Sequence, residues 1–334
     1  MGLQTYIVLV FLPGFVVSQG IDQHKNFNLI NEERCGIPKA AQRQIHHGAK
    51  ATAGQFPWMV LITANMIEKL NESHSISSPI TCTGTILNAK YILSVAHCFV
   101  VDPPYELHNI EFTIPEIGPI TEPNKKKKVY HGEYVIRHPE YRTTYFFVND
   151  IAIIRVKGTI EFSDTVGPIC LEHGRLLEED YTGVMASVAG FGVYDFKDVF
   201  SNNSLERNNP VIDNDLRYLP NFPIVDDEQC IDYIADCCQE LVESINRSVL
   251  NSQICAGGEV EKFAYTGDSG GPLMVIQSEN KGGAPRHGIT RWGSPVFSKT
   301  ATTLKYTYPN VFVRVRYYIE WILDNMEPAG WLSE

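Results

Sequence analysis

A serine in residues 266–272, Thr-Gly-Asp-Ser-Gly-Gly-Pro, has the surroundings of a catalytic nucleophile. Glycines on both sides allow Ser269 to occupy a tight turn that bulkier neighbours would block. On such a turn the backbone N–H groups of Gly267 and Ser269 would point into one small space and hold an oxyanion while the serine attacks a carbonyl. Asp268, if buried, requires a cationic partner. Taken alone, the segment also fits a plain loop.

Two earlier segments carry residue types that would activate this serine. Residues 94–98, Ser-Val-Ala-His-Cys, end an apolar segment, and residues 149–154, Asn-Asp-Ile-Ala-Ile-Ile, begin another. Serine is a poor nucleophile at neutral pH and needs a base, and histidine is the side chain best suited to exchange protons near neutrality, which makes His97 the candidate. His97 would take the serine proton and return it to the leaving amine, while Asp150 would hold the imidazole in the correct tautomer. The chain order His, Asp, Ser is that of chymotrypsin-type triads.

With these three motifs in this order, the chain resembles the secreted serine proteases of the chymotrypsin–trypsin family, in particular arthropod-type members with a short pro-segment. The resemblance covers about Cys35 to the C-terminus. It implies an all-β fold of two six-stranded antiparallel Greek-key barrels with a C-terminal helix. It also implies a secreted serine endopeptidase that is made as a zymogen. The alternative is a catalytically silent, secreted homologue that binds or regulates partners, which residues Gln44, Phe263 and Arg291 favour.

The chain divides into three expected parts. Residues 1–18 are interpreted as a signal peptide because residues 6–17 are apolar and small residues follow, although no Lys or Arg precedes them. Residues 19–44 are polar and are interpreted as a pro-segment or light chain. Residues 45–334 would be the peptidase domain. The apolar segment is too short for a membrane span, so we expect an extracellular protein.

Charge and composition limit the partners. A net formal charge of −11 argues against affinity for nucleic acid or anionic membranes. Lys125 to Lys128 are an exception and are interpreted as a solvated loop tip, with a basic patch that docks an acidic partner as the alternative. The resemblance implies a protein or peptide substrate, an unknown activating protease and protein inhibitors as partners. Three sequons in polar segments are expected to be glycosylated, at Asn71, Asn202 and Asn246.

Eight cysteines indicate an oxidising compartment, but their connectivity does not follow from the sequence. The resemblance implies three pairs: Cys82–Cys98, Cys230–Cys255 and Cys35–Cys170. Cys237 and Cys238 remain, and they would pair with each other, exchange with Cys230 or link another chain.

Short apolar segments separated by turn residues predict β structure throughout the catalytic part. The clearest strands are expected at residues 58–62, 83–87, 91–93, 151–156, 184–188 and 311–315. Residues 66–79 and 194–215 are polar and rich in turn-forming residues, which predicts two long surface loops. Residues 316–326 predict a closing amphipathic helix with Tyr317, Trp321 and Ile322 on one face.

The residues at the expected substrate pocket depart from the family. The resemblance places Phe263, six residues before the serine, at the pocket floor, where an acidic residue gives trypsin-like members their preference for Arg and Lys. A trypsin-like preference is therefore not expected. Trp292, Gly293 and Asn310 would form the pocket wall. Phe263 and Asn310 would either leave a shallow pocket or none, or Phe263 would turn into the barrel and leave an ordinary apolar pocket.

Two further departures concern regulation of the site. Arg291 stands where the family has a serine that bonds the triad aspartate, so its guanidinium would either pair with Asp150 or point to solvent. In the family, a new N-terminal amine pairs with the aspartate beside the serine, here Asp268. The matching N-terminus is Ile45, but Gln44 precedes it instead of Arg or Lys. Either an unusual activator exists or the protein remains a zymogen.

No cofactor and no metal ion are expected. Glu116 and Glu122 lie in the loop where some relatives of this family bind calcium. Four lysines follow directly, which makes the loop a poor cation site.

Overall fold

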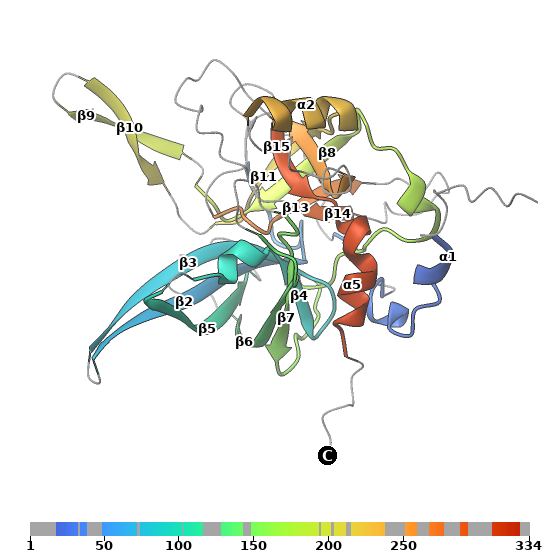
Figure 1. The fold of residues 1–334 in the computed structure, drawn as a ribbon, viewed down its shortest axis with the longest axis horizontal. Helices are drawn as coiled ribbons and strands as arrows, with labels where there is room; N and C mark the ends of the chain where they lie inside the picture. The colour runs from blue at the N-terminus through green and yellow to red at the C-terminus, as the bar shows by residue number, and fades with distance from the viewer. Residues whose placement is uncertain are drawn as a thin grey trace, which may run out of the picture.

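The computed structural model describes residues 18–32, 34–38, 49–71, 74–101, 103–115, 128–142, 148–193, 195–201, 204–211, 215–237, 251–258, 267–276, 288–292 and 309–327. Within these residues β structure dominates and the helices are short (Figure 1). None of the helices described is long and apolar enough to cross a bilayer.

The first β unit is a closed antiparallel barrel. Its six strands are, in order around the barrel, β2 (Met59–Asn71), β3 (His74–Ile86), β4 (Tyr91–Ser94), β7 (Ala152–Lys157), β6 (Lys128–Arg137) and β5 (Tyr105–Ile114). Apolar side chains from facing strands fill the interior, and Ile62, Ile92, Phe112 and Ile154 are fully buried there. Closure leaves the barrel no free edge along its fully paired region. The first of the two predicted barrels is therefore confirmed.

The second β unit is a seven-stranded antiparallel sheet. Its order is β1 (Ala49–Lys50), β11 (Arg217–Pro223), β8 (Met185–Gly190), β13 (Pro272–Ile276), β14 (Gly288–Trp292), β15 (Pro309–Val313) and β12 (Gln253–Gly257). A single bridge pairs Ile224, which follows β11, with Ala256 of β12. It joins the two outer strands of the set formed by the six longer strands. The predicted fold class is therefore confirmed, and the second six-stranded unit is closed less completely than the first. Among the described residues it is a sheet rolled onto itself and closed by a single bridge, with β1 added outside.

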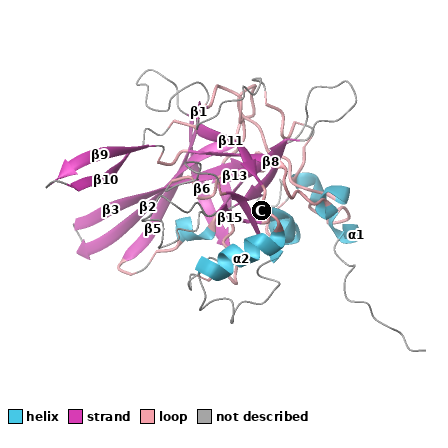
Figure 2. Cartoon of the chain, turned by 90° about the horizontal axis from the view of Figure 1, so that it is seen from above, coloured by secondary structure: helices cyan, strands magenta, loops and turns pink. Residues whose placement is uncertain are grey.

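Two hairpins replace the predicted surface loops. Strands β2 and β3 pair from Met59–Thr85 to Asn71–His74, so residues 66–79 are an extended hairpin. Residues 195–211 form a second hairpin, of β9 (Asp195–Ser201) and β10 (Ser204–Val211). Both project from the same side of the molecule (Figures 1 and 2). The loop predictions were wrong because polar composition was taken to exclude strands, whereas these polar segments pair through their backbones.

The C-terminal helix is shorter than predicted. A 3₁₀ turn, η4 (Val315–Tyr318), leads into α5 (Ile319–Asp324). Ile322 is buried and Trp321 packs against the core, as expected. Tyr317, which was predicted to share this face, is 53% exposed. It lies in the 3₁₀ turn, whose residues follow a tighter spacing than an α-helix and therefore leave the predicted face.

The N-terminal segment packs against this helix. It contains α1 (Ser18–Ile21) and the 3₁₀ turn η1 (Phe27–Leu29), and the disulfide Cys35–Cys170 ties it to the body. The buried Asn26 side-chain amide donates to the backbone carbonyls of Leu323 at 2.9 Å and Met326 at 2.7 Å. Leu323 lies in the last turn of α5 and Met326 lies two residues beyond it, so the amide binds the C-terminal end of this helix. The segment therefore holds the C-terminal end of α5.

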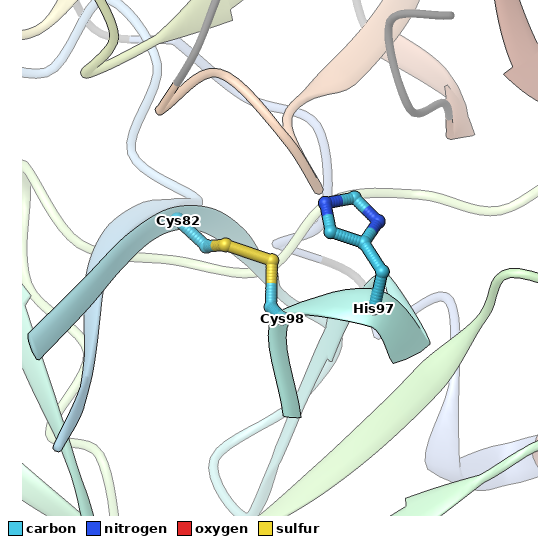
Figure 3. Close-up of side chains that lie close together, drawn as sticks. All are labelled: Cys82, His97 and Cys98. Atoms are coloured by element: carbon cyan, nitrogen blue, oxygen red, sulfur yellow. A yellow bond between two sulfur atoms is a disulfide. The ribbon is translucent and has the colours of Figure 1, made fainter. Parts of the chain in front are cut away.

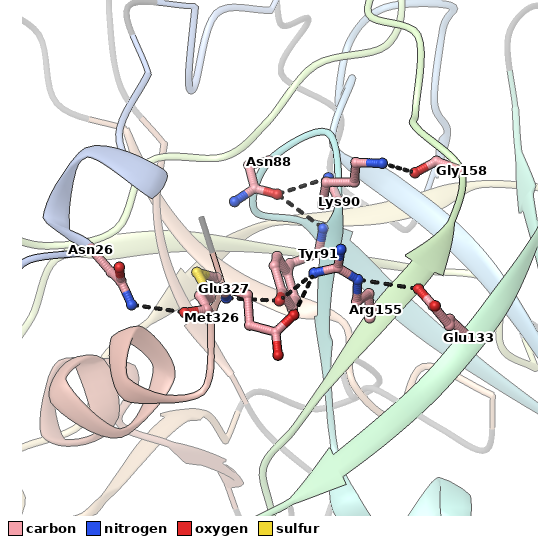
Figure 4. Close-up of polar contacts among 9 residues, drawn as sticks. All are labelled: Asn26, Asn88, Lys90, Tyr91, Glu133, Arg155, Gly158, Met326 and Glu327. Atoms are coloured by element: carbon pink, nitrogen blue, oxygen red, sulfur yellow. Dashed lines mark hydrogen bonds and ion pairs between the residues drawn. The ribbon is translucent and has the colours of Figure 1, made fainter. Parts of the chain in front are cut away.

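A buried arginine links the chain end after α5 to the first barrel (Figure 4). Arg155 of β7 donates to the Tyr91 hydroxyl at 2.9 Å and to the carboxylates of Glu133 at 3.1 Å and Glu327 at 3.3 Å. The same hydroxyl accepts the backbone N–H of Glu327 at 2.9 Å. A guanidinium that is only 8% exposed needs such partners because burying an unpaired charge is costly.

Candidate active site

His97 lies on a short turn that is anchored by a disulfide. The 3₁₀ turn η2 (Ala96–Phe99) follows β4 directly, and Cys98 within it is bonded to Cys82 of β3. Ala96, Cys98 and Phe99 are buried, while the histidine side chain is 23% exposed. The turn therefore has a fixed base and presents one imidazole at the surface.

Asp150 contacts His97 through both of its oxygens. The imidazole Nδ1 lies 2.7 Å from Oδ2, and the backbone N–H of His97 donates to Oδ1 at 2.8 Å. Asp150 itself is fully buried. Because a carboxylate accepts hydrogen bonds, Nδ1 carries the proton in this arrangement and Nε2 is left with its lone pair. The pairing of β4 with β7 brings these two residues together, since each adjoins one end of these strands.

Asn149 holds the backbone that carries Asp150. Its φ of 53° lies in the left-handed region, which asparagine tolerates better than most residues. Its side chain donates to the Glu140 carbonyl at 3.1 Å and accepts from the Tyr318 hydroxyl at 2.7 Å. Burial raises the pKa of Tyr318 to about 12, so this hydroxyl keeps its proton and remains a donor. A residue of the C-terminal turn thus supports the aspartate.

Ser269 lies on a turn that is bonded to strand β3. Its carbonyl accepts the backbone N–H of Thr83 at 2.8 Å, and the serine is 8% exposed. The flanking Gly267 and Gly270 have φ values of 96° and 84°, which favour glycine. A Cβ on Gly270 would lie 2.2 Å from the Thr83 carbonyl oxygen. The predicted glycine turn is therefore present and packs closely on β3, next to the residue that anchors the histidine turn.

The side chain of Asp268 leaves the serine turn and lies between Gly190 and Gly192. Its Oδ1 accepts the backbone N–H of Gly192 at 2.8 Å. A Cβ on Gly190 would lie 2.1 Å from the same oxygen, and one on Gly192 would lie 2.7 Å from the backbone nitrogen of Asp268. Only glycines leave room for this carboxylate. Asp268 is half-buried.

A cluster that looks like a metal site is explained by the disulfide. The ligand atoms of Cys82, His97 and Cys98 lie within 4.8 Å of one another. Figure 3 shows the two sulfur atoms bonded to each other beside the imidazole. Metal binding by cysteine requires a thiolate, which a disulfide sulfur is not. This cluster is therefore no metal centre.

The structure describes only part of the expected substrate pocket. Asn310 lies in β15 opposite Ala256 and is 8% exposed. Arg291 and Trp292 lie in β14, where Arg291 pairs with Leu273, but their side chains are outside the described part. Phe263, Gly293 and Ile45 also lie outside it. The pocket, the Arg291 alternatives and the activation pair remain predictions.

The remaining expected residues concern disulfides and glycans. The three disulfides join the pairs that the resemblance implies, Cys35–Cys170, Cys82–Cys98 and Cys230–Cys255. Cys230 lies in α2 (Asp227–Cys237), and Cys238 is outside the described residues. Asn71 lies at the end of β2, paired with His74 at the hairpin tip. Asn202 and Asn246 are outside the described residues.

Three supporting residues were not predicted. Asn149 was part of the motif that contains Asp150, and asparagine is one of the few residues besides glycine that adopt a left-handed backbone. Thr83 follows a cysteine of the anchoring disulfide, but the sequence carries no sign of its contacts. Tyr318 is 169 residues from Asn149 and only the fold brings them together.

Comparisons with known proteins agree on one family. The sequence profile described as Trypsin matches residues 45–322. The Spaetzle-processing enzyme of Drosophila melanogaster is 26% identical over 309 residues, which cover 85% of this chain and 67% of that protein. The phenoloxidase-activating enzyme of Bombyx mori is 27% identical, with 88% and 63% covered. Chymotrypsin-C of Bos taurus is 31% identical over 252 residues, with 74% and 78% covered.

A solved structure supports the fold alone. The structure described as HL collagenase superposes with a TM-score of 0.54 at 22% identity, and covers 84% of this chain and 98% of that one. The chain spans about two thirds of the length of the two insect relatives named above.

Proposed function

Because the chain belongs to the trypsin family of serine endopeptidases, we propose that Ser269 is its nucleophile, His97 its general base and acid, and Asp150 the carboxylate that orients the histidine. The observation that carries this proposal is the double contact between His97 and Asp150, at 2.7 and 2.8 Å. Support comes from strand β3, which is disulfide-bonded to the histidine turn and hydrogen-bonded to the serine turn.

The reaction follows from these roles. His97 Nε2 removes the Ser269 hydroxyl proton as Oγ forms a bond to the substrate carbonyl carbon. The carbonyl oxygen becomes an oxyanion, and the N–H groups of Gly267 and Ser269 donate to it. Asp150 stabilises the imidazolium that results. His97 then protonates the leaving amine as the peptide C–N bond breaks, and a water molecule releases the acyl group by the same steps in reverse order.

The protein is made as a zymogen in this account. Cleavage between Gln44 and Ile45 frees an amine that pairs with Asp268, whose carboxylate already bonds Gly192. The family profile begins at residue 45, the same residue. The disulfide Cys35–Cys170 and the Asn26 hydrogen bonds would keep the cleaved segment attached. Gln44 implies an activating protease that does not need Arg or Lys before the bond.

The substrate is proposed to be another protein. Two relatives have names that describe the processing of Spaetzle and the activation of phenoloxidase, so both act on proteins. An Arg or Lys side chain would be a poor fit for this chain's pocket, because Phe263 offers no counter-charge for its desolvation. The disulfides support a location outside the cell, since such bonds persist in oxidising compartments.

The test is a recombinant chain with a specific protease site placed directly before Ile45. Cut and uncut samples are assayed on a peptide library, beside the Ser269→Ala variant treated in the same way. We expect activity only in the cut wild type and little cleavage after Arg or Lys. Equal activity in both samples would rule out the activation step, and a profile dominated by Arg or Lys would rule out the pocket assignment. No activity in either sample would favour the silent homologue.

A further inference from the structure

The side-chain hydroxyl of Thr83 joins two segments of the second β unit. It donates to the Gly267 carbonyl oxygen at 2.9 Å and accepts the backbone N–H of Phe191 at 3.3 Å. Thr83 is a residue of β3 in the first barrel and is fully buried. One hydroxyl therefore uses both its donor and its acceptor capacity between the serine turn and the end of β8.

The backbone of Thr83 also forms hydrogen bonds, one of them to the serine turn. Its N–H donates to the Ser269 carbonyl at 2.8 Å, and its own carbonyl accepts the Ser94 hydroxyl at 2.9 Å. Thr83 thus contacts the carbonyls of Gly267 and Ser269, the two residues whose N–H groups are proposed to hold the oxyanion.

Gly267 needs such a contact because glycine has little conformational preference of its own. Its φ of 96° is open only to glycine at low cost, and a Cβ there would lie 2.8 Å from the Gly192 Cα. Because only glycine fits at this position, the residue has no side chain that would limit rotation of its backbone. A hydrogen bond to the Gly267 carbonyl holds the peptide plane between Gly267 and Asp268 and so limits rotation at this residue.

We propose that Thr83 is a positioning residue whose hydroxyl holds Gly267 so that its N–H and that of Ser269 converge on the oxyanion. This rests on the proposed function of Ser269. Without the hydroxyl, the Gly267 carbonyl and the Phe191 N–H both lose a buried partner, and the peptide plane between Gly267 and Asp268 loses the hydrogen bond that holds it. The N–H groups of Gly267 and Ser269 stabilise the negative charge that develops on the substrate carbonyl oxygen in the transition state. Losing their alignment therefore lowers kcat more than it raises KM.

The test compares three activated variants. Thr83→Val removes the hydroxyl and keeps the branched shape, and Thr83→Ser keeps the hydroxyl. Thr85→Val is the matched control, because Thr85 lies on the same strand, is equally buried, and its hydroxyl has no hydrogen-bond partner among the described residues. We expect Thr83→Val to lower kcat by about tenfold with KM within about twofold, somewhat less than removal of an oxyanion donor itself. Thr83→Ser and Thr85→Val should stay near wild type.

A second measurement separates positioning from general stability. A peptidyl trifluoromethyl ketone forms an oxyanion on the serine, whereas the matching alcohol does not. Thr83→Val should weaken inhibition by the ketone by about tenfold and leave the alcohol unchanged. If this variant does not fold, by its thermal unfolding midpoint, Thr83→Ala takes its place.

An unchanged kcat in Thr83→Val, failure of Thr83→Ser to retain activity, or equal losses for ketone and alcohol would overturn the proposal. These outcomes presuppose an active wild type. An activated wild type that neither cleaves peptides nor binds the ketone would instead contradict the proposed function itself.

Discussion

The imidazole Nδ1 of His97 lies 2.7 Å from Asp150 Oδ2, and the backbone N–H of the same histidine donates to the other oxygen at 2.8 Å. One buried carboxylate therefore orients both the ring and the turn that carries it. Since Asp150 is fully buried, water does not compete for either contact.

Asp150→Asn should keep the shape of this contact and reverse its polarity. The amide NH₂ would donate to Nδ1, so the proton would move to Nε2 and the ring would lose its function as a base. We expect kcat of the activated variant to fall by roughly four orders of magnitude at neutral pH, as in other triads. The thermal unfolding midpoint serves as the folding control. A loss of less than about tenfold in a folded variant would show that His97 is not oriented by Asp150 during catalysis.

Tyr318→Phe should loosen Asp150 indirectly. It removes the 2.7 Å hydrogen bond to the Asn149 side chain and leaves the ring in place. The expected cost is about 1 kcal/mol of unfolding free energy. We also expect a several-fold lower kcat with KM unchanged, because Asn149 adjoins the triad aspartate.

The neighbouring Tyr317→Phe is the matched control, because Tyr317 is 53% exposed. Urea unfolding and steady-state kinetics measure both effects. If the two tyrosine variants have the same kcat, Asn149 does not position Asp150.

Gly192→Ala should disturb the Asp268 carboxylate. The added Cβ would lie 2.7 Å from both the Cγ and the backbone nitrogen of Asp268, so rotation of the side chain alone does not relieve the clash. We expect a folded protein whose activity after cleavage before Ile45 is at least about tenfold lower, since Asp268 lies between the two residues that are proposed to donate to the oxyanion.

Gly167→Ala is the control for this change, because nothing lies within 4 Å of a Cβ at that position. The fraction of active enzyme is measured by active-site titration. Equal fractions in the two variants would mean that the fit of Asp268 between glycines has no role in the active conformation.

His138 should make the fold sensitive to acid. Its ring lies against Tyr318 and Trp321, with centroid distances of 5.5 and 5.1 Å. Burial lowers the pKa of His138 below its ordinary value of 6.5, an effect that the nearby Glu140 partly offsets. The folded state therefore favours the neutral ring, and this stabilisation is full above the ordinary pKa and is lost as pH falls below it.

The measurement compares urea unfolding of wild type and His138→Gln between pH 7.5 and 5. The variant should lose less unfolding free energy over this interval than wild type, because its side chain does not titrate. An identical loss in the two proteins would show that His138 does not contribute to acid sensitivity.

Much of the fold class followed from the sequence, and particular features did not. The apolar segments around His97 and Asp150 identified β4 and β7, and the family and the all-β class are confirmed. Residues 66–79 were interpreted as a loop because polar residues outnumber apolar ones there and no regular alternation marks a strand, although Met66 is buried. The single bridge from Ile224 to Ala256 that closes the second sheet depends on where strand ends meet, which local patterns do not encode.

At the site, the sequence motifs indicated the triad residues but not the residues that hold them in position. His97 and Asp150 were predicted as partners from their motifs, and the structure places their side chains in contact. Thr83 and Tyr318 were not predicted, because their contacts are with residues 184 and 169 positions away. Such contacts depend on tertiary packing between the two β units, and short-range sequence patterns carry no information about it.

The most direct test of the catalytic account is labelling with a fluorophosphonate, which reacts with an activated serine. The chain is cleaved directly before Ile45, exposed to the probe, digested and examined by peptide mass spectrometry, with His97→Ala treated in parallel. The account predicts one adduct, on Ser269, that forms in the cleaved wild type and is lost in His97→Ala. No adduct in the cleaved wild type, or an adduct on Ser269 that persists without His97, would contradict it.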